Sequence, residues 1–489
     1  MLKMLTSPPD TRPIPGNRRA RTAPPRAGAA RARRRHHAAI GCALIAPLLA
    51  AGCTSYHAAP LPEQDSLAAG VAALELPAAA WPGPAPRAHR FDPADGLDMW
   101  ETAMLAVANY PLLRAERRKR GVAEAQLYAA RLFPDPQLAV SLERPTGSEP
   151  GLVNGYGGAL GYDLIALVTR SAGVSAADGA RRQVSLDLLW QEWQTVEMAR
   201  SAHVELLTLR RKIALLEDML TLYDRRYQQS LNAMRSGDLT VDVAGTDLTA
   251  LLDTATLLNQ LRQTCNGRRN DLALLLGLSP DAALNLRATG APAPRPAPQI
   301  EAALHAMTRR RPDLLALAAG YDSQEARVRK AVLSQFPNLG LGITRARDTG
   351  GIVSSGLAID ISLPLFSGNR GNIAVERATR EQLRAEYEAR IDQSRIDVAR
   401  LAGVQALIQD QRALLALRVP ELEAMVASAR QAYGSGDIDA LTFLNMQTTL
   451  VNKQLEQLDL EQQLWSTQLA LDTLLGTVTM DDQQGTPRP

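Results

Sequence analysis

The residue types that most often carry catalysis or bind metals are scattered along this chain. Its six histidines are His36, His37, His57, His89, His203 and His305. No Cys-x-x-Cys pair occurs and the methionines form no cluster, whereas zinc and copper sites need several such side chains converging on one point. The pairs Gly157-Gly158 and Gly350-Gly351 lack the spacing and the following Lys-Ser/Thr of a phosphate-binding loop. We therefore expect no metal site, no cofactor and no enzyme activity.

One cysteine near the start of the sequence has a context that suggests covalent modification. The apolar run Leu49-Ala50-Ala51-Gly52-Cys53 resembles the lipobox of bacterial lipoproteins, in which the cysteine is acylated and becomes the new N-terminus. The run is too short to span a bilayer, so residues 1–52 are predicted to be a signal peptide. By the same resemblance, Thr54 favours delivery to the outer membrane. The alternative is an ordinary secretory signal with a chance cysteine. Cys265 lies in a helical apolar stripe and is expected to be a small buried hydrophobe.

The charge of the chain is unevenly distributed. Ten of the 54 Lys and Arg residues, but only one of the 51 Asp and Glu residues, lie in residues 1–52. The rest is therefore acidic overall, and the net charge of +3 does not indicate nucleic-acid binding. Residues 53–96 are rich in Ala and Pro and are predicted to form an extended tether.

The remaining sequence is written twice. Pro111 and Pro312 lie 201 positions apart, and the pairs Gly237-Asp238 and Gly436-Asp437 repeat at 199. Such long self-similarity indicates a duplicated supersecondary unit. We place repeat 1 at 97–280, a linker at 281–300, repeat 2 at 301–477 and a tail at 478–489.

Each repeat is predicted to hold a helix, a β-hairpin, a long helix and a return helix. In repeat 1 the opening helix runs over 97–132, the hairpin over about 137–168, and the long helix over 174–234. In repeat 2 the hairpin covers about 338–365 and the long helix 372–433. That helix contains Pro420, which should leave a kink.

The strands alternate apolar and polar residues, which is the period of a β-strand with two different faces. By this parity Asp163 and Asp360 share the face opposite the apolar one. Because a charge facing hydrocarbon is costly, we expect both to line an aqueous lumen. The alternative is an error in the assumed register.

The element lengths predict an oligomer. The two shorter helices of a repeat together match its long helix, so each repeat supplies two helical columns and one hairpin. Four strands cannot close a barrel, and open strand edges are not tolerated in lipid. Three copies would give twelve strands.

These elements resemble the TolC-like outer membrane factor family, the exit ducts of efflux and secretion systems. The resemblance covers about 97–476. It is carried by Pro312-Asp313-Leu314, by the junction Pro364-Leu365-Phe366-Ser367-Gly368, by Gly436-Asp437-Ile438, and by the Leu-Leu-Gly that closes each repeat. Pro134-Asp135-Pro136-Gln137-Leu138 and Gly371-Asn372-Ile373-Ala374 are similar to the CzcC-like heavy-metal efflux branch.

The resemblance implies a fold of the α+β class that is mostly α. It implies a homotrimer with a twelve-stranded β-barrel in the outer membrane and a helical barrel in the periplasm. Such a duct is passive, and it works with a periplasmic adaptor (membrane fusion protein) and an inner-membrane pump. The protein would sit in the outer membrane of a Gram-negative bacterium, in contact with its lipid.

The resemblance also assigns roles to the helix turns. Gly237-Asp238-Leu239 and Gly436-Asp437-Ile438 would form the periplasmic tips that dock the adaptor. The plainer interpretation is that Gly and Asp are the expected helix caps at any such turn. Related ducts narrow the mouth with carboxylates just past the turn. Here Asp242, Asp247 and Asn445 are the candidates, although a solvated helix face explains the two acids equally well.

Three functions remain open from the sequence. The leading hypothesis is an efflux duct for small toxic cargo such as metal ions or drugs. The second is the duct of a type I protein secretion system. The third, from a different class, is a lipid-anchored periplasmic coiled-coil adaptor or scaffold without a membrane barrel.

Overall fold

The computed structural model describes residues 56–74, 95–146, 150–288, 290 and 294–477. The chain divides into two compact units, 1–65 and 66–489. The first unit is described only over 56–65, which contain no helix or strand. The expected signal peptide, Cys53 and the tail at 478–489 lie outside the described residues. All that follows concerns the second unit, which we call the main unit.

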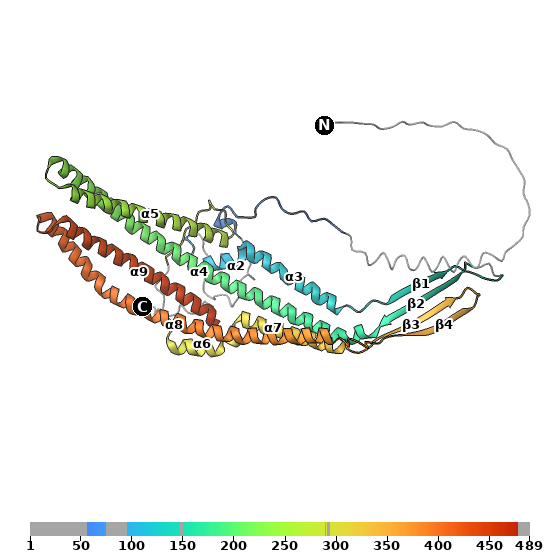
Figure 1. Ribbon diagram of the computed structural model, residues 1–489. Helices are drawn as coiled ribbons and strands as arrows, with labels where there is room; N and C mark the ends of the chain where they lie inside the picture. Colours follow the sequence, from blue (N-terminus) through green and yellow to red (C-terminus); the bar gives the residue numbers. More distant parts are fainter. Residues whose placement is uncertain (1–55, 75–94, 147–149, 289, 291–293, 478–489) are drawn as a thin grey trace, which may run out of the picture. The chain divides into compact units, whose positions relative to one another are not determined.

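The main unit contains the same series of elements twice (Figure 1). After a short 3-10 turn, η1 (Val71–Ala73), the first series is α2 (Met99–Asn109), α3 (Pro111–Arg131), β1 (Gln137–Glu143), β2 (Gly155–Asp163), α4 (Leu164–Ser236) and α5 (Val241–Leu275). The second is α6 (Ala297–Arg310), α7 (Pro312–Leu333), β3 (Asn338–Arg347), β4 (Val353–Ser362), α8 (Arg370–Ser435) and α9 (Ala440–Leu475). The order of elements repeats as the sequence predicts.

The opening helix of each repeat is broken into two, which corrects the single helix predicted over 97–132. Pro111 and Pro312 are the first residues of α3 and α7. A proline disfavours helical geometry in the residue before it. Accordingly Tyr110 has ψ 116° and Arg311 has ψ 122°, both outside the helical region.

The strands form one antiparallel sheet in the order β1-β2-β3-β4. The first hairpin is shorter than predicted, because β2 ends at Asp163 and residues 164–168 already belong to α4. The Asp163 side chain accepts hydrogen bonds from Ile165 N and Ala166 N, which is the geometry of a helix N-cap. The second hairpin likewise ends at Ser362 rather than near 365.

The long helices run past two residues that could have interrupted them. α8 continues as one helix on both sides of Pro420. α4 contains Gly179, where a Cβ would lie 2.9 Å from backbone atoms of Ser323. The Ser323 hydroxyl donates to the carbonyl of Ala176 at 2.7 Å. Gly179 therefore permits close packing of α7 against α4.

Apolar contacts join the helices along their length. One cluster includes Leu105 of α2, Leu206 of α4 and Leu272 of α5, all fully buried. A second joins α8 to α9, and a third brings Leu216 of α4 and Leu258 of α5 against Leu444 of α9. The third cluster links the two repeats. Within the described part of the chain, none of the helices is long and apolar enough to cross a membrane.

Candidate functional site

The sheet has an exposed apolar face. Cross-strand pairing places Leu138, Leu160, Ile343 and Leu357 in one row across all four strands. Their side chains are 72%, 44%, 59% and 84% exposed. Residues directly opposite each other in a ladder project from the same face. The row is therefore a continuous apolar surface that nothing in the main unit covers among the described residues.

The other face carries small and acidic residues. Asp163 pairs with Gly340, and Gly340 pairs with Asp360, so both acids lie on one row. The predicted sharing of a face by Asp163 and Asp360 is confirmed. Gly340 lies between them in this row, and a Cβ there would lie 3.4 Å from the Cβ of Asp360.

The two acids differ in how they are used. Asp163 Oδ1 accepts from Ile165 N at 2.9 Å and from Ala166 N at 3.1 Å. Asp360 is exposed, and its side chain makes no hydrogen bond or ion pair among the described residues. Of these two acids, Asp360 is thus the one whose carboxylate has no partner among the described residues. That either acid lines a lumen stays a prediction.

Both outer strands have an open edge. Among the described residues, β1 pairs only with β2 and β4 pairs only with β3. The outward backbone N–H and C=O groups of these two strands lack partners within the sheet. An edge of this kind is a template for pairing with another chain.

The helix turns at the far ends of α4 and α8 have the same geometry. Gly237 and Gly436 are left-handed, with φ of 83° and 84°. Asp238 N donates to Ala233 O at 2.9 Å, and Asp437 N donates to Ala432 O at 2.8 Å. These are the bonds of a glycine C-cap, so that interpretation is confirmed. Leu239 and Ile438 are half-buried and the two Asp are exposed, while adaptor docking at both tips stays a prediction.

The residues after the two turns differ. In repeat 2, Asp439 caps α9 by accepting from Thr442 N at 2.6 Å, and this bond lowers the pKa of Asp439. In repeat 1 the equivalent cap is Thr240, whose side chain makes no capping bond. Asp242 is exposed in the first turn of α5, and the nearby Thr240 hydroxyl lowers its pKa. The acids after the two turns therefore differ in position, because Asp439 is the N-cap of α9 whereas Asp242 lies in the first turn of α5.

Asp247 does not face open space, which corrects its expected place at the mouth. It is 2% exposed and pairs with Arg226, with 2.8 Å between Nε and Oδ1. The Ser230 hydroxyl donates to its other oxygen. Its carboxylate is thus paired inside the α4–α5 hairpin and does not face solvent.

Arg226 is a structural residue that sequence reasoning missed. Its second terminal nitrogen donates to Ala440 O at 2.7 Å. Its guanidinium also lies over the rings of Tyr433 and Phe443, at 5.2 and 5.6 Å. Arg226 therefore ties repeat 1 to both helices of the second tip. In sequence it follows Asp224 and Arg225, and this charged run looks like an ordinary solvated face.

Asn445 lies beside an open groove between α4, α5 and α9. The groove has a volume of about 420 Å³ and is also lined by Thr246, Asp253 and Tyr223. The hydroxyls of Tyr223 and Thr448 are 2.9 Å apart across it. Asn445 is exposed, and its place at the mouth stays a prediction.

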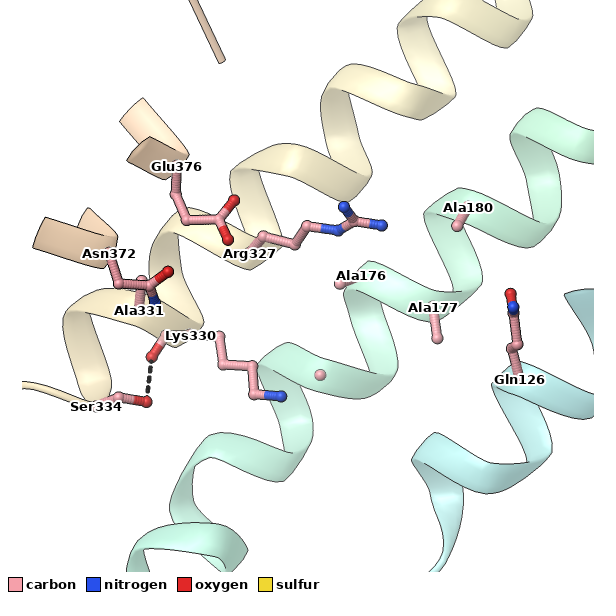
Figure 2. A pocket seen from close by; sticks show the side chains of 11 residues that line it. Gln126, Ala176, Ala177, Ala180, Arg327, Lys330, Ala331, Ser334, Asn372 and Glu376 are labelled. Atoms are coloured by element: carbon pink, nitrogen blue, oxygen red, sulfur yellow. Dashed lines mark hydrogen bonds between the residues drawn. The ribbon is translucent and has the colours of Figure 1, made fainter. Parts of the chain in front are cut away.

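A second hollow lies close to the sheet, where α3, α4, α7 and α8 meet (Figure 2). It has a volume of about 460 Å³. Gly173, Ala176, Ala177 and Ala180 of α4 form one wall, and Arg327 and Lys330 of α7 extend toward that wall.

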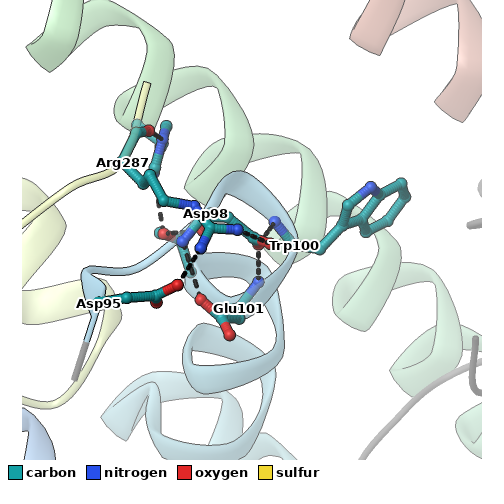
Figure 3. A network of polar contacts seen from close by, with 7 residues as sticks. Asp95, Asp98, Trp100, Glu101 and Arg287 are labelled. Carbon is teal, nitrogen blue, oxygen red and sulfur yellow. Dashed lines mark hydrogen bonds and ion pairs between the residues drawn. The ribbon is translucent and has the colours of Figure 1, made fainter. Parts of the chain in front are cut away.

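A polar network anchors the start of α2 (Figure 3). Asp98 Oδ1 accepts from Trp100 N and Glu101 N, both at 2.8 Å, and Glu101 Oε2 accepts from Asp98 N at 2.9 Å. This is a complete capping box. Arg287 pairs with Asp95 and lies 3.6 Å from Asp98 Oδ2. The network ties the chain after α5 to the beginning of the repeat.

Buried His203 also connects the start of α2 with the chain after α5. Its Nδ1 is 2.9 Å from the Thr102 hydroxyl and its Nε2 is 3.1 Å from the carbonyl of Arg287. Burial lowers the pKa of His203 to about 4. Sequence reasoning excluded a histidine metal cluster but did not predict that a single histidine would join three segments.

Comparison with known proteins gives the same fold. The sequence profile described as "Outer membrane efflux protein" matches residues 303–477. CusC, in a structure described by its transmembrane channel formation, has a TM-score of 0.65 at 18% identity, over 82% of this chain and 98% of CusC. The outer membrane protein VceC of Vibrio cholerae has a TM-score of 0.64 at 18% identity, over 77% and 96%.

The open-state MtrE outer membrane channel of Neisseria gonorrhoeae has a TM-score of 0.62 at 16% identity, over 77% and 88%. A search of curated proteins finds no match. The match over 303–477 coincides with the predicted repeat 2, while the solved channels cover both repeats. Residues 303–477 thus match the family model of outer membrane efflux proteins, and the chain as a whole has the TolC-like fold of the solved outer membrane efflux channels.

Proposed function

We propose that this protein is the outer membrane exit duct of a tripartite efflux system and acts as a homotrimer. The observation that carries the proposal is the sheet, which combines an exposed apolar face with two open edges. A four-stranded sheet with these properties is not expected to be stable by itself in water or in lipid. The backbone N–H and C=O groups at its two edges need hydrogen-bond partners.

Trimer formation removes both problems together. If β4 of one copy pairs with β1 of the next, three copies close a ring of twelve strands. The row containing Leu138 and Leu357 then contacts lipid, and the row containing Asp163 and Asp360 faces the water-filled interior. Antiparallel barrels of the outer membrane have this arrangement of apolar outside and polar inside.

The helical part of each copy continues the duct into the periplasm. The tips at Gly237-Asp238-Leu239 and Gly436-Asp437-Ile438 lie at the ends of α4 and α8 away from the sheet (Figure 1). We place the periplasmic adaptor there, with the inner-membrane pump behind it. The duct is passive, and the acylated Cys53 adds a lipid anchor at the membrane. The cargo is small and toxic, in keeping with the resemblance to the CzcC-like branch.

Neighbouring residues of β4 allow a matched test of the barrel. Leu357 lies on the apolar row and Ala358 on the opposite face, across from Gly342. An arginine on the lipid face costs about 2–4 kcal/mol near the middle of the membrane. Leu357→Arg should therefore reduce the trimer in outer membrane fractions and abolish conductance in planar bilayers. Ala358→Arg should leave assembly intact.

Equal tolerance of the two substitutions would overturn the barrel and would favour a periplasmic scaffold. Cargo is tested separately, by deleting the gene and measuring growth on metals, dyes and antibiotics. Sensitivity restored by the wild-type gene supports efflux. Unchanged sensitivity to every compound, with loss of a secreted protein, would assign the duct to type I secretion instead.

A further inference from the structure

Four short segments join helices to strands at one end of the sheet. They are residues 131–137, 163–170, 327–338 and 362–377, and we call them together the junction collar. They lie at the same end because Gln137 pairs with Gly161 and Asn338 pairs with Ser362. In a barrel that crosses the membrane, the collar stands where the strands leave the lipid on the side of the helices.

The collar concentrates exposed aromatic side chains. Of the five phenylalanines in the chain, Phe133, Phe336 and Phe366 lie in it. They are 66%, 57% and 96% exposed. A soluble protein would normally bury such side chains, whereas aromatic residues gather at the headgroup level of membranes. Exposed aromatic side chains of this kind fit a membrane–water interface.

The same segments carry basic side chains that the protein leaves unpaired. Those in exposed positions are Arg131, Arg327, Arg329, Lys330, Arg370 and Arg377. None of these six makes an ion pair within the described residues. Elsewhere the exposed cations are often matched, as in Arg262 with Glu217 and Arg268 with Glu205. The collar is therefore a local excess of positive charge on a chain whose remainder beyond residue 52 is acidic.

The acids of the collar do little to neutralise this charge. They are Asp135, Asp163 and Glu376. Asp163 caps α4, and Gln324 donates to both the backbone and the carboxylate of Glu376.

One further basic residue of the collar packs on an aromatic ring. Arg170 is held against Phe133, with its guanidinium carbon 4.3 Å from the ring centroid, and donates to Leu132 O at 3.2 Å.

The hollow of Figure 2 borders the collar, which supplies its walls from α7 and α8, and it suits one phosphate group. Arg327 and Lys330 reach from α7 toward α4, and Lys330 Nζ lies 3.8 Å from where a Cβ on Gly173 would stand. The small side chains of α4 leave the volume of about 460 Å³ open beneath the two cations. Asn372 contributes an amide on the side of α8, and Glu376 of the same helix also lines the pocket, with its carboxylate held by Gln324. Two cations with an adjacent amide can form charge-assisted hydrogen bonds to phosphate oxygens.

We infer that this pocket and the surrounding collar bind the headgroup of an anionic phospholipid, of the phosphatidylglycerol class, in the periplasmic leaflet of the outer membrane. The inference rests on the proposed function, because it requires the sheet to lie in that membrane. The phosphodiester sits between Arg327 and Lys330. The exposed phenylalanines lie at the depth where the headgroups meet the acyl chains.

The test uses the full-length protein purified in detergent. Binding of short-chain phosphatidylglycerol, phosphatidylethanolamine and inorganic phosphate is measured by native mass spectrometry. The wild type should retain phosphatidylglycerol in preference to phosphatidylethanolamine. Arg327→Gln with Lys330→Gln should weaken phosphatidylglycerol binding, by about fivefold for each cation removed. Arg327→Lys with Lys330→Arg should retain it.

The matched control removes two exposed cations from α5, by Arg262→Gln with Arg268→Gln, and should leave lipid binding unchanged. Equal phosphatidylglycerol binding by the wild type and the Arg327/Lys330 double variant would overturn the site. Competition by inorganic phosphate at the same concentration as the lipid would show a free-phosphate site and would also overturn it. Trimer mass and conductance of each variant report on the proposed duct separately, so failure of one proposal is distinguishable from failure of the other.

Discussion

Arg226 and Asp247 form an ion pair inside the first tip hairpin, and the same arginine reaches the backbone of Ala440 in the second repeat. The side chains of the pair are 7% and 1% exposed. Removing one partner of a buried ion pair is costly, because the remaining charge has no solvent to stabilise it. The two tip hairpins are therefore coupled through one guanidinium.

Arg226→Met should strongly destabilise the protein. Leaving Asp247 buried without its partner should cost about 3–5 kcal/mol. Adding Asp247→Leu should recover much of this loss, since no charge then remains. Thermal unfolding followed by circular dichroism measures both variants. As a control, Arg262→Ala removes an exposed pair with Glu217 and should cost at most about 1 kcal/mol. Equal effects of Arg226→Met and Arg262→Ala would contradict the burial argument.

Gly179 should tolerate no side chain. Gly179→Ala is expected to cost about 1–3 kcal/mol, because the added methyl meets the backbone of Ser323 and forces α7 away from α4. Gly121→Ala on α3 is the matched control, since among the described residues no atom outside the local backbone of α3 lies within 4 Å of its Cβ position. There the substitution should stabilise by about 0.5–1 kcal/mol through helix propensity. Chemical denaturation of the two variants compares them, and the same sign for both would refute the close approach.

His203 should make stability fall in acid. Its pKa is lowered to about 4 in the folded protein, so the folded state binds fewer protons than the unfolded state below the ordinary value of 6.5. The stability that comes from keeping His203 neutral is therefore fully present above about pH 6.5. It is lost as the pH falls toward 4, and the free energy of unfolding decreases by about 1.4 kcal/mol per pH unit. His203→Gln should remove this slope. Unfolding measured from pH 7.5 to 4 tests it, and an unchanged slope in the variant would assign the acid sensitivity to other groups.

Asp360 should influence ion selectivity more than Asp163 does. Asp360→Asn removes an uncommitted carboxylate, so the preference of the channel for cations over anions should fall in planar-bilayer recordings. Asp163→Asn should have a smaller effect on selectivity, because that carboxylate already faces the N-terminus of α4. Asp163→Ala should instead cost about 1 kcal/mol of stability through the lost cap. Selectivity unchanged by Asp360→Asn would place the acidic face outside the conduction path.

The two tips should bind the adaptor unequally. Asp238→Cys and Asp437→Cys place a cross-linkable thiol at equivalent exposed positions of the two turns. Both should cross-link to the adaptor in cells, with different yields, because Asp439 caps the second tip and Thr240 does not cap the first. Cys at the exposed position of Thr256, within α5, serves as a control away from the tips. Absence of cross-linking at both tips in a functional system would exclude docking there.

Local patterns in the sequence were sufficient for much of the architecture. The alternation around Leu357 and Asp360 predicted the strand and both of its faces, since side-chain direction in a strand depends only on position. Gly237 and Gly436 marked the helix ends, because a left-handed residue is required there and glycine adopts it without strain. The duplication predicted that the elements recur in the same order.

What the sequence determined by itself is thus the series of elements and the faces of the strands. Tertiary structure alone decided which polar side chains are paired or hydrogen-bonded within the protein. Asp163 became a helix cap, Asp247 was buried by Arg226, and His203 was enclosed by Thr102 and the chain after α5. The physical reason is that the cost of a charge or a polar group depends on the neighbours that surround it. For Asp247, the arginine that pairs with it lies 21 positions away, and the carbonyl of Ala440, which the same arginine also contacts, lies 214 positions from Arg226. Neither contact can be predicted from the helix or strand periodicity of the sequence.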